Sequence, residues 1–190
     1  MVLIKRKMSE FVTFIPGVNS TRAEKQFGIQ KIKYYDQNDF ERDLCYDEGV
    51  DNKNLLFTDN ALKQGDVIIS NSMRLATMVG KNNAGKVPSL NFTKVEFKNN
   101  GLDKQYFIYL FNYYNDIKRQ KERELQGSAM ARIPIKALNE LIIPVVPMEE
   151  QKKIGLIYSE IIKLQNKLGK YAIMIEQFAK SILEENLKGK

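Results

Sequence analysis

Residues 142–154 read IIPVVPMEEQKKI and join a strand-like apolar run to a long helix. Pro144 cannot donate a hydrogen bond inside a sheet, so we expect the strand to end there or to lie at a sheet edge. Pro147 is typical of the approach to a helix N-terminus. Two glutamates follow it in the first turn, where the helix dipole favours acidic side chains. The stretch therefore predicts a domain over residues 1–147 that leads into a helix over residues 148–190.

The predicted helix has apolar side chains at alternating spacings of three and four, the a/d pattern of a coiled coil. These positions, called the seam below, are Ile154, Ile157, Ile161, Leu164, Leu168, Tyr171, Ile175, Phe178 and Ile182. A helix of this length reaches roughly 60 Å, well beyond the width of a small domain. We expect its apolar face to pair with another molecule, because the preceding domain offers a single other long helix. The alternative is that the helix folds back over residues 1–147.

The composition excludes several classes of protein. The 190-residue chain has no histidine, which removes Ser-His-Asp and Cys-His catalysis and histidine metal sites. A single cysteine, Cys45, excludes an intrachain disulfide and favours a reducing, cytoplasmic compartment. No apolar run is long enough to span a bilayer, and no metal or cofactor motif is present, so neither a membrane nor a cofactor is expected. The net charge of +7 suggests a polyanionic partner such as nucleic acid, although many basic proteins bind none.

Residues 1–147 show the mixed periodicity of an irregular, β-rich α+β domain. Residues 67–70 form a β-branched run that predicts a buried strand, and residues 76–80 predict the next one. Residues 92–97 alternate apolar and polar side chains, as a half-buried strand does. The period then becomes helical from Asp103 onward, and the predicted helix stops by Gly127.

Polar and basic loops between these strands are the candidates for contact with DNA. Arginine can bind guanine through two hydrogen bonds, asparagine can bind adenine in the same way, and lysine neutralises phosphate. The candidate residues are Arg22, Lys25, Tyr34, Asn71, Ser72, Arg74, Lys81, Asn82, Lys86, Ser128 and Arg132. The competing interpretation of any one of these loops is plain solvated surface.

One catalytic pattern is also present. Glu96 and Lys98 form an E-x-K pattern at the end of a predicted strand, and Asp66 lies beside another strand. A metal-dependent nuclease uses acidic residues to hold magnesium and a lysine to orient water. The competing interpretation is a strand edge, because the alternating apolar side chains already account for the segment.

Four stretches together resemble the specificity subunit of a type I restriction–modification system. They are residues 62–70, 106–111, 127–135 and 141–154, and they occur in the family's order. The resemblance implies a target recognition domain at 1–147, which reads half of a split DNA sequence, and a spacer helix that follows it. It also implies a non-catalytic subunit, whose methyltransferase and restriction partner subunits supply the chemistry.

The sequence departs from that family in one respect, because the usual subunit has two recognition domains and two spacer helices. This chain has one of each and resembles half a subunit. We expect two copies to pair their helices antiparallel as a homodimer that reads a palindromic bipartite site. The helix length limits the distance between the two domains to roughly 18 base pairs. The alternative is a protein that binds the methyltransferase or intact specificity subunits and competes with them without DNA selectivity.

Overall fold

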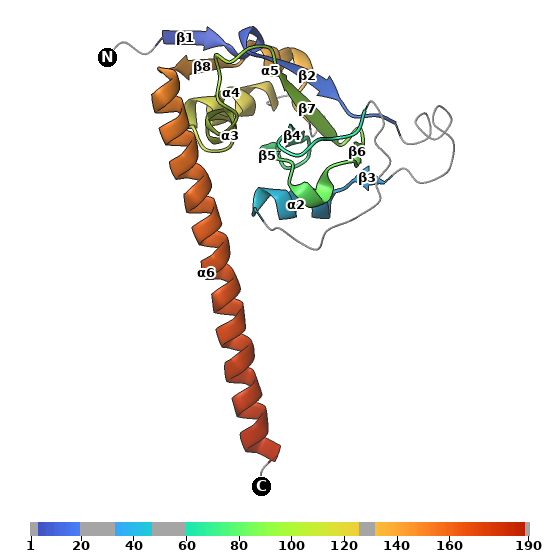
Figure 1. The fold of residues 1–190 in the computed structure, drawn as a ribbon, viewed down its shortest axis with the longest axis vertical. Coiled ribbons are helices and arrows are strands. Elements are labelled where there is room, and N and C mark those ends of the chain that lie inside the picture. Colours follow the sequence, from blue (N-terminus) through green and yellow to red (C-terminus); the bar gives the residue numbers. More distant parts are fainter. Residues whose placement is uncertain (1–3, 20–32, 47–59, 126–131, 189–190) are drawn as a thin grey trace.

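The computed structural model describes residues 4–19, 33–46, 60–125 and 132–188. It confirms the α+β class, with a β-rich globular part and one long C-terminal helix that extends away from it (Figure 1). Among the described helices, none combines the length and apolar character needed to cross a membrane.

An antiparallel four-stranded sheet forms the centre of the globular part. Its order is β2 (Val12–Pro16), β7 (Phe92–Phe97), β4 (Val67–Ser70) and β5 (Leu75–Met78). The strands predicted at 67–70 and 92–97 are confirmed, and the one predicted at 76–80 begins and ends earlier. All four side chains of β4 are buried, because β4 is an interior strand with packing on both faces.

The two faces of the sheet support separate apolar clusters. Val67 and Ile69 point into the larger cluster with α3 (Lys104–Asn112) and α5 (Ile135–Glu140), whereas Ile68 points into the smaller cluster beneath α2 (Gln37–Leu44). This alternation follows the two-residue period of a strand. The sheet is therefore a middle layer, and α2 covers the face opposite to α3.

The remaining elements join distant parts of the chain. The strand β1 (Ile4–Lys7) pairs antiparallel with β8 (Ile142–Val145). Pro144 thus lies inside a two-stranded sheet in which each strand is an edge, as its missing N–H requires. Short elements complete the chain: η1 (Met8–Glu10), η2 (Lys81–Asn83), β3 (Tyr34–Tyr35) and β6 (Val87–Pro88), of which β3 and β6 pair in parallel.

The single helix predicted after Asp103 is in fact two helices. The first, α3, ends at Asn112, and α4 (Asn115–Leu125) begins three residues later. The break coincides with the sequence Asn112-Tyr113-Tyr114-Asn115, whose residues have modest helix propensity. The Asn112 side chain also binds the edge strand β5, so the chain turns where that contact is made.

The long helix α6 (Met148–Lys188) attaches to the globular part along its first half only. Residues that recur every three or four positions are buried or half-buried on the face toward the globular part, and they are Gln151, Gly155, Ser159, Ile162 and Asn166. Asn166 donates to the carbonyl oxygen of Cys45 over 2.9 Å. From 167 to 187 every side chain is exposed, so the described helix does not fold back over the domain (Figure 1).

Gly155 allows α6 to approach α3 closely. A Cβ atom there would lie 2.7 Å from the Cβ atom of Gln105 and 2.7 Å from the backbone nitrogen of Tyr106. Both distances are far inside van der Waals contact, and one of the atoms is backbone. Gly169 lies two heptads further along the same helix, and a Cβ atom there would have no neighbour within 4 Å.

These two glycines give a matched test of the helix attachment. Gly155→Ala should lower the free energy of unfolding by about 1–3 kcal/mol, because the clash outweighs the gain in helix propensity. Gly169→Ala should raise it by up to about 1 kcal/mol, because there alanine improves propensity without a clash. Denaturant unfolding at one protein concentration measures both, and a stabilised Gly155→Ala protein would contradict the close approach.

Candidate nucleic-acid interface

The turn between β4 and β5 presents three of the polar loop residues predicted from the sequence. Asn71 fixes the start of this turn. Its side-chain amide donates to the Leu90 carbonyl over 3.0 Å and accepts from the Thr93 hydroxyl over 2.9 Å. The buried Ser70 hydroxyl lies 3.2 Å from the Ser72 hydroxyl and accepts from the Met73 backbone N–H. The predicted Asn71 is therefore an anchor of the turn in this structure.

Arg74 ends the turn in an unusual backbone conformation. Its φ is 58°, in the left-handed region, which costs a residue with a Cβ atom about 1 kcal/mol. The backbone N–H of Arg74 bonds to the Ser70 carbonyl over 2.8 Å, and its own carbonyl accepts from the Lys121 ammonium over 3.0 Å. Arg74 as a whole residue is exposed. The turn thus presents the Arg74 side chain outward from a backbone that is held at both ends.

Lys121 lies beneath this turn and is almost fully buried, with 6% of its surface exposed. Its ammonium donates to the Phe111 carbonyl over 2.6 Å, near the C-terminal end of α3, and lies 4.1 Å from the centre of the Phe111 ring. Burial, followed by the nearby cations Lys118 and Arg74, lowers the pKa of Lys121 to about 8. Three cationic side chains, Lys118, Lys121 and Arg74, thus lie close enough to act on one another, and such a group suits a polyanion.

Asn112 fixes the edge strand beside the turn. Its side-chain oxygen accepts from the Ala76 N–H over 2.7 Å, and its side-chain nitrogen donates to the Ala76 carbonyl over 2.8 Å. Both backbone groups on the outer edge of β5 at this residue are satisfied in the way that a further strand would satisfy them. Neither Asn112 nor Lys121 was among the residues predicted from sequence. The spacing of four between the buried Ile117 and Lys121 is the single sequence signal that places this lysine on an inward face.

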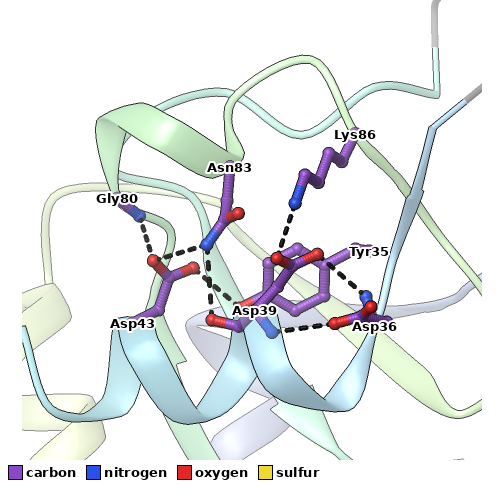
Figure 2. Close-up of polar contacts among 7 residues, drawn as sticks. All are labelled: Tyr35, Asp36, Asp39, Asp43, Gly80, Asn83 and Lys86. Atoms are coloured by element: carbon purple, nitrogen blue, oxygen red, sulfur yellow. Dashed lines mark hydrogen bonds and ion pairs between the residues drawn. The ribbon is translucent and has the colours of Figure 1, made fainter. Parts of the chain in front are cut away.

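A second polar cluster lies between α2 and the loop that follows β5 (Figure 2). The Asp43 carboxylate accepts from the Tyr35 hydroxyl over 2.7 Å, from the Gly80 N–H over 3.0 Å and from the Asn83 side chain over 2.9 Å. Burial raises the pKa of Asp43, and these hydrogen bonds oppose that rise. The cluster holds the loop between β5 and β6 against α2.

The predicted phosphate contact at Lys86 falls inside this cluster. The Lys86 ammonium lies 2.5 Å from the Asp39 carboxylate, and the two side chains are only 11% and 6% exposed (Figure 2). Asp39 also accepts from the Asp36 N–H, so its position is fixed from a second side. The structure gives Lys86 a role in holding this loop, which competes with the predicted contact.

The other predicted contacts are dispersed. Lys81 and Asn82 belong to η2, at the far end of β5 from Arg74, so these two loops are not brought together. Tyr34 is half-buried in β3, and Arg132 is exposed before α5. Arg22, Lys25 and Ser128 lie outside the described residues. The turn with Ser72 and Arg74 is the best-defined candidate in the described part of the chain.

The residues of the suggested nuclease site are separated by their contacts. Glu96 is exposed on β7, Lys98 donates to the Ser9 carbonyl over 2.6 Å, and Asp66 pairs with Lys94 at 2.8 Å. The described residues contain no group of three or more acidic, cysteine or histidine side chains that could hold a metal ion.

The seam residues of α6 divide into two groups. Ile154 is half-buried and packs against the larger apolar cluster of its own domain. The other eight are exposed by 42% to 69% of their surface, and they are Ile157, Ile161, Leu164, Leu168, Tyr171, Ile175, Phe178 and Ile182. With 100° per residue, this exposed seam lies roughly opposite the face that contacts the domain.

The chain matches the family model described as "Type I restriction modification DNA specificity domain" over residues 18–176. This stretch includes the strands β7, β4 and β5 of the central sheet, the turn at Arg74 and most of α6. The chain belongs to the type I restriction–modification DNA specificity domain family. A search of curated proteins finds no match.

Solved specificity subunits have the same fold at low sequence identity. The HsdS subunit from Thermoanaerobacter tengcongensis matches with a TM-score of 0.56 and 18% identity, covering 98% of this chain and 45% of that one. A structure from work on the complex assembly and conformational transition of the type I restriction–modification system matches with a TM-score of 0.58 and 17% identity. The match covers 97% of this chain and 44% of that one. The S subunit from M. genitalium matches with a TM-score of 0.51 and 17% identity, covering 95% of this chain and 44% of that one. This specificity-domain chain therefore spans less than half the length of those subunits.

The role of Lys86 in this specificity domain can be tested directly. Lys86→Met should lower the free energy of unfolding by up to about 3 kcal/mol, because it leaves the buried Asp39 carboxylate without its cation. Lys63→Met, at an exposed lysine, should change stability by less than about 0.5 kcal/mol. Thermal unfolding compares the two. If Lys86→Met melts like the unaltered protein and instead weakens salt-dependent DNA binding, Lys86 is a phosphate contact.

Proposed function

We propose that this protein is the DNA-recognition component of a type I restriction–modification system. The observation that carries the proposal is the family match, which covers most of the globular part and most of the helix. The net charge of +7 and the electropositive turn at Arg74 support it, because DNA binding depends on neutralising phosphates. In this proposal residues 1–147 read one half of a split DNA sequence, and the helix sets its distance from the other half.

The exposed seam supports pairing between two copies. Eight large apolar side chains lie on a face that the chain's own domain does not cover, and an apolar face of this extent needs a partner. Antiparallel pairing about a twofold axis places one domain at each end of the helix pair. Such a homodimer would present two identical readers to a palindromic bipartite site, and it would restore the length that the solved subunits have in one chain.

Catalysis belongs to other subunits in this proposal. The protein would bring a methyltransferase and a restriction subunit to the DNA target and carry out no reaction itself. Two alternatives remain distinguishable from it. Magnesium-dependent cleavage that is lost in Glu96→Ala would establish a nuclease. Co-purification with methyltransferase or intact specificity subunits, without selectivity for a DNA sequence, would establish a competitor.

The first prediction of this proposal concerns DNA. In a pool of randomised duplexes, the protein together with its methyltransferase subunit should enrich a defined sequence. The affinity for that sequence should fall steeply with salt, because each phosphate contact contributes a slope of about −0.9 in log K against log salt. Electrophoretic selection followed by sequencing measures the first, and titration at several salt concentrations measures the second. If DNA binding is absent, or if the affinity does not change with salt, the proposal is refuted.

The second prediction concerns assembly. Leu164→Asp with Leu168→Asp should give monomers in sedimentation velocity, because two carboxylates would enter the middle of the seam. Leu156→Asp with Ile173→Asp is the matched control: the two side chains are 55% and 56% exposed, and at 100° per residue each lies at least about a quarter turn from the neighbouring seam residues. The control should remain dimeric. An unaltered dimer in the Leu164 and Leu168 variant would refute pairing through the seam.

A further inference from the structure

The turn from Ser72 to Arg74 and the buried Lys121 form one unit. Three side chains at the tip are exposed, and they differ in chemistry: a hydroxyl at Ser72, an apolar thioether at Met73 and a guanidinium at Arg74. A hydroxyl, an apolar group and an arginine fork are the types of group that distinguish base edges in the major groove. Met73 is additionally steadied by Gln37, whose side-chain nitrogen lies 2.6 Å from its sulfur atom.

The cost of burying Lys121 calls for an explanation. A buried ammonium is unfavourable, and here two further cations, Lys118 and Arg74, act on it while Glu122 alone opposes them. An apolar residue would fill the same space at lower cost. What the ammonium supplies is a bridge between two backbone carbonyls, one in α3 at Phe111 and one in the turn at Arg74.

The bridge acts on the one strained residue of the turn. Arg74 has a positive φ, and a backbone in that region persists only where surrounding contacts hold it. The bond from Lys121 to the Arg74 carbonyl is such a contact, and the bond from the Arg74 N–H to the Ser70 carbonyl is another. Strained residues of this kind concentrate at sites of function, where they orient a side chain in advance. Here the side chain so oriented is the exposed guanidinium.

We propose that the turn Ser72–Arg74 is a base-reading element and that Lys121 is its positioning residue, setting the direction of Arg74 without touching DNA. This rests on the proposed function and adds to it which described turn reads bases and what fixes that turn. Lys121 cannot reach a phosphate while both of its hydrogen bonds point inward and 94% of its surface is covered. It therefore affects which sequence is bound, and it leaves the number of phosphate contacts unchanged.

The experiment uses the full chain together with its methyltransferase subunit and a pool of randomised duplexes, and it compares the enriched sequences of four proteins. Arg74→Gly removes the guanidinium and suits a left-handed backbone. Lys121→Met removes both hydrogen bonds and keeps an apolar stem on the Phe111 ring. Lys118→Met is the matched control, because it removes the same charge from the same helix without touching the turn. The unaltered protein is the fourth.

We expect Arg74→Gly to lose its preference at one or a few adjacent base pairs, by about tenfold or more per base pair. Lys121→Met should lose preference at the same base pairs, and its salt slope should equal that of the unaltered protein, because no phosphate contact is removed. Lys118→Met should keep the sequence of the unaltered protein. Lys121→Gln, which removes the charge but keeps an amide NH2 group as a donor, serves if Lys121→Met does not fold.

Three outcomes would overturn the proposal. An unchanged sequence in Arg74→Gly would show that the turn does not read bases. An unchanged sequence in folded Lys121→Met or Lys121→Gln would show that the lysine merely caps α3. A uniform loss of affinity with a salt slope smaller by about one would make Lys121 a phosphate contact. Failure of the unaltered protein to enrich any sequence is a separate result, and it would overturn the proposed function.

Discussion

The buried amide of Gln151 holds the helix and the globular part in one fixed relation, and the rest of the structure depends on that relation. Its side-chain oxygen accepts from the Asp103 N–H over 2.9 Å, and its nitrogen donates to the carbonyls of Gly101 and Val146. With 1% of its surface exposed, the amide lies in low dielectric, where satisfied hydrogen bonds are strong and broken ones costly. One side chain thus ties the start of α3, the end of β8 and the first turn of α6 together. Gly155 then lets the two helices approach, so the direction of α6 is set within its first two turns.

Much of the fold could be predicted from local patterns. The strands at 67–70 and 92–97 carry strong β patterns, and the joint at Pro144 and Pro147 marks the start of α6, as the structure shows. The pairing of β1 with β8 could not be predicted, because all four side chains of β1 are exposed and its partner is more than a hundred residues away. The break between α3 and α4 was missed for a similar reason: it depends on the contact between Asn112 and Ala76, which no periodicity contains.

The candidate interface shows a sharper limit of sequence reasoning. Composition identifies polar and basic loop residues, but it does not distinguish a side chain that faces a partner from one that holds its own loop. Asn71 and Lys86 were predicted to contact DNA, and in the structure both make buried or half-buried contacts within the chain. Lys121 was not among the predicted site residues, and it is the most deeply buried lysine of the described chain. The distinction is tertiary, since it depends on what each loop packs against.

The one-sided attachment of α6 has a consequence for the order in which the protein is made. The exposed seam follows the globular part in the sequence, so it leaves the ribosome after the residues of the sheet and of α3. Domains commonly fold as units during synthesis, and transiently exposed apolar surface is what leads nascent chains to aggregate. In this chain the longest apolar surface emerges when the globular part already has all of its own segments, including the first turns of α6. In the proposed homodimer, each copy would therefore complete its globular part before it meets a second copy, and the order of synthesis would separate folding from assembly.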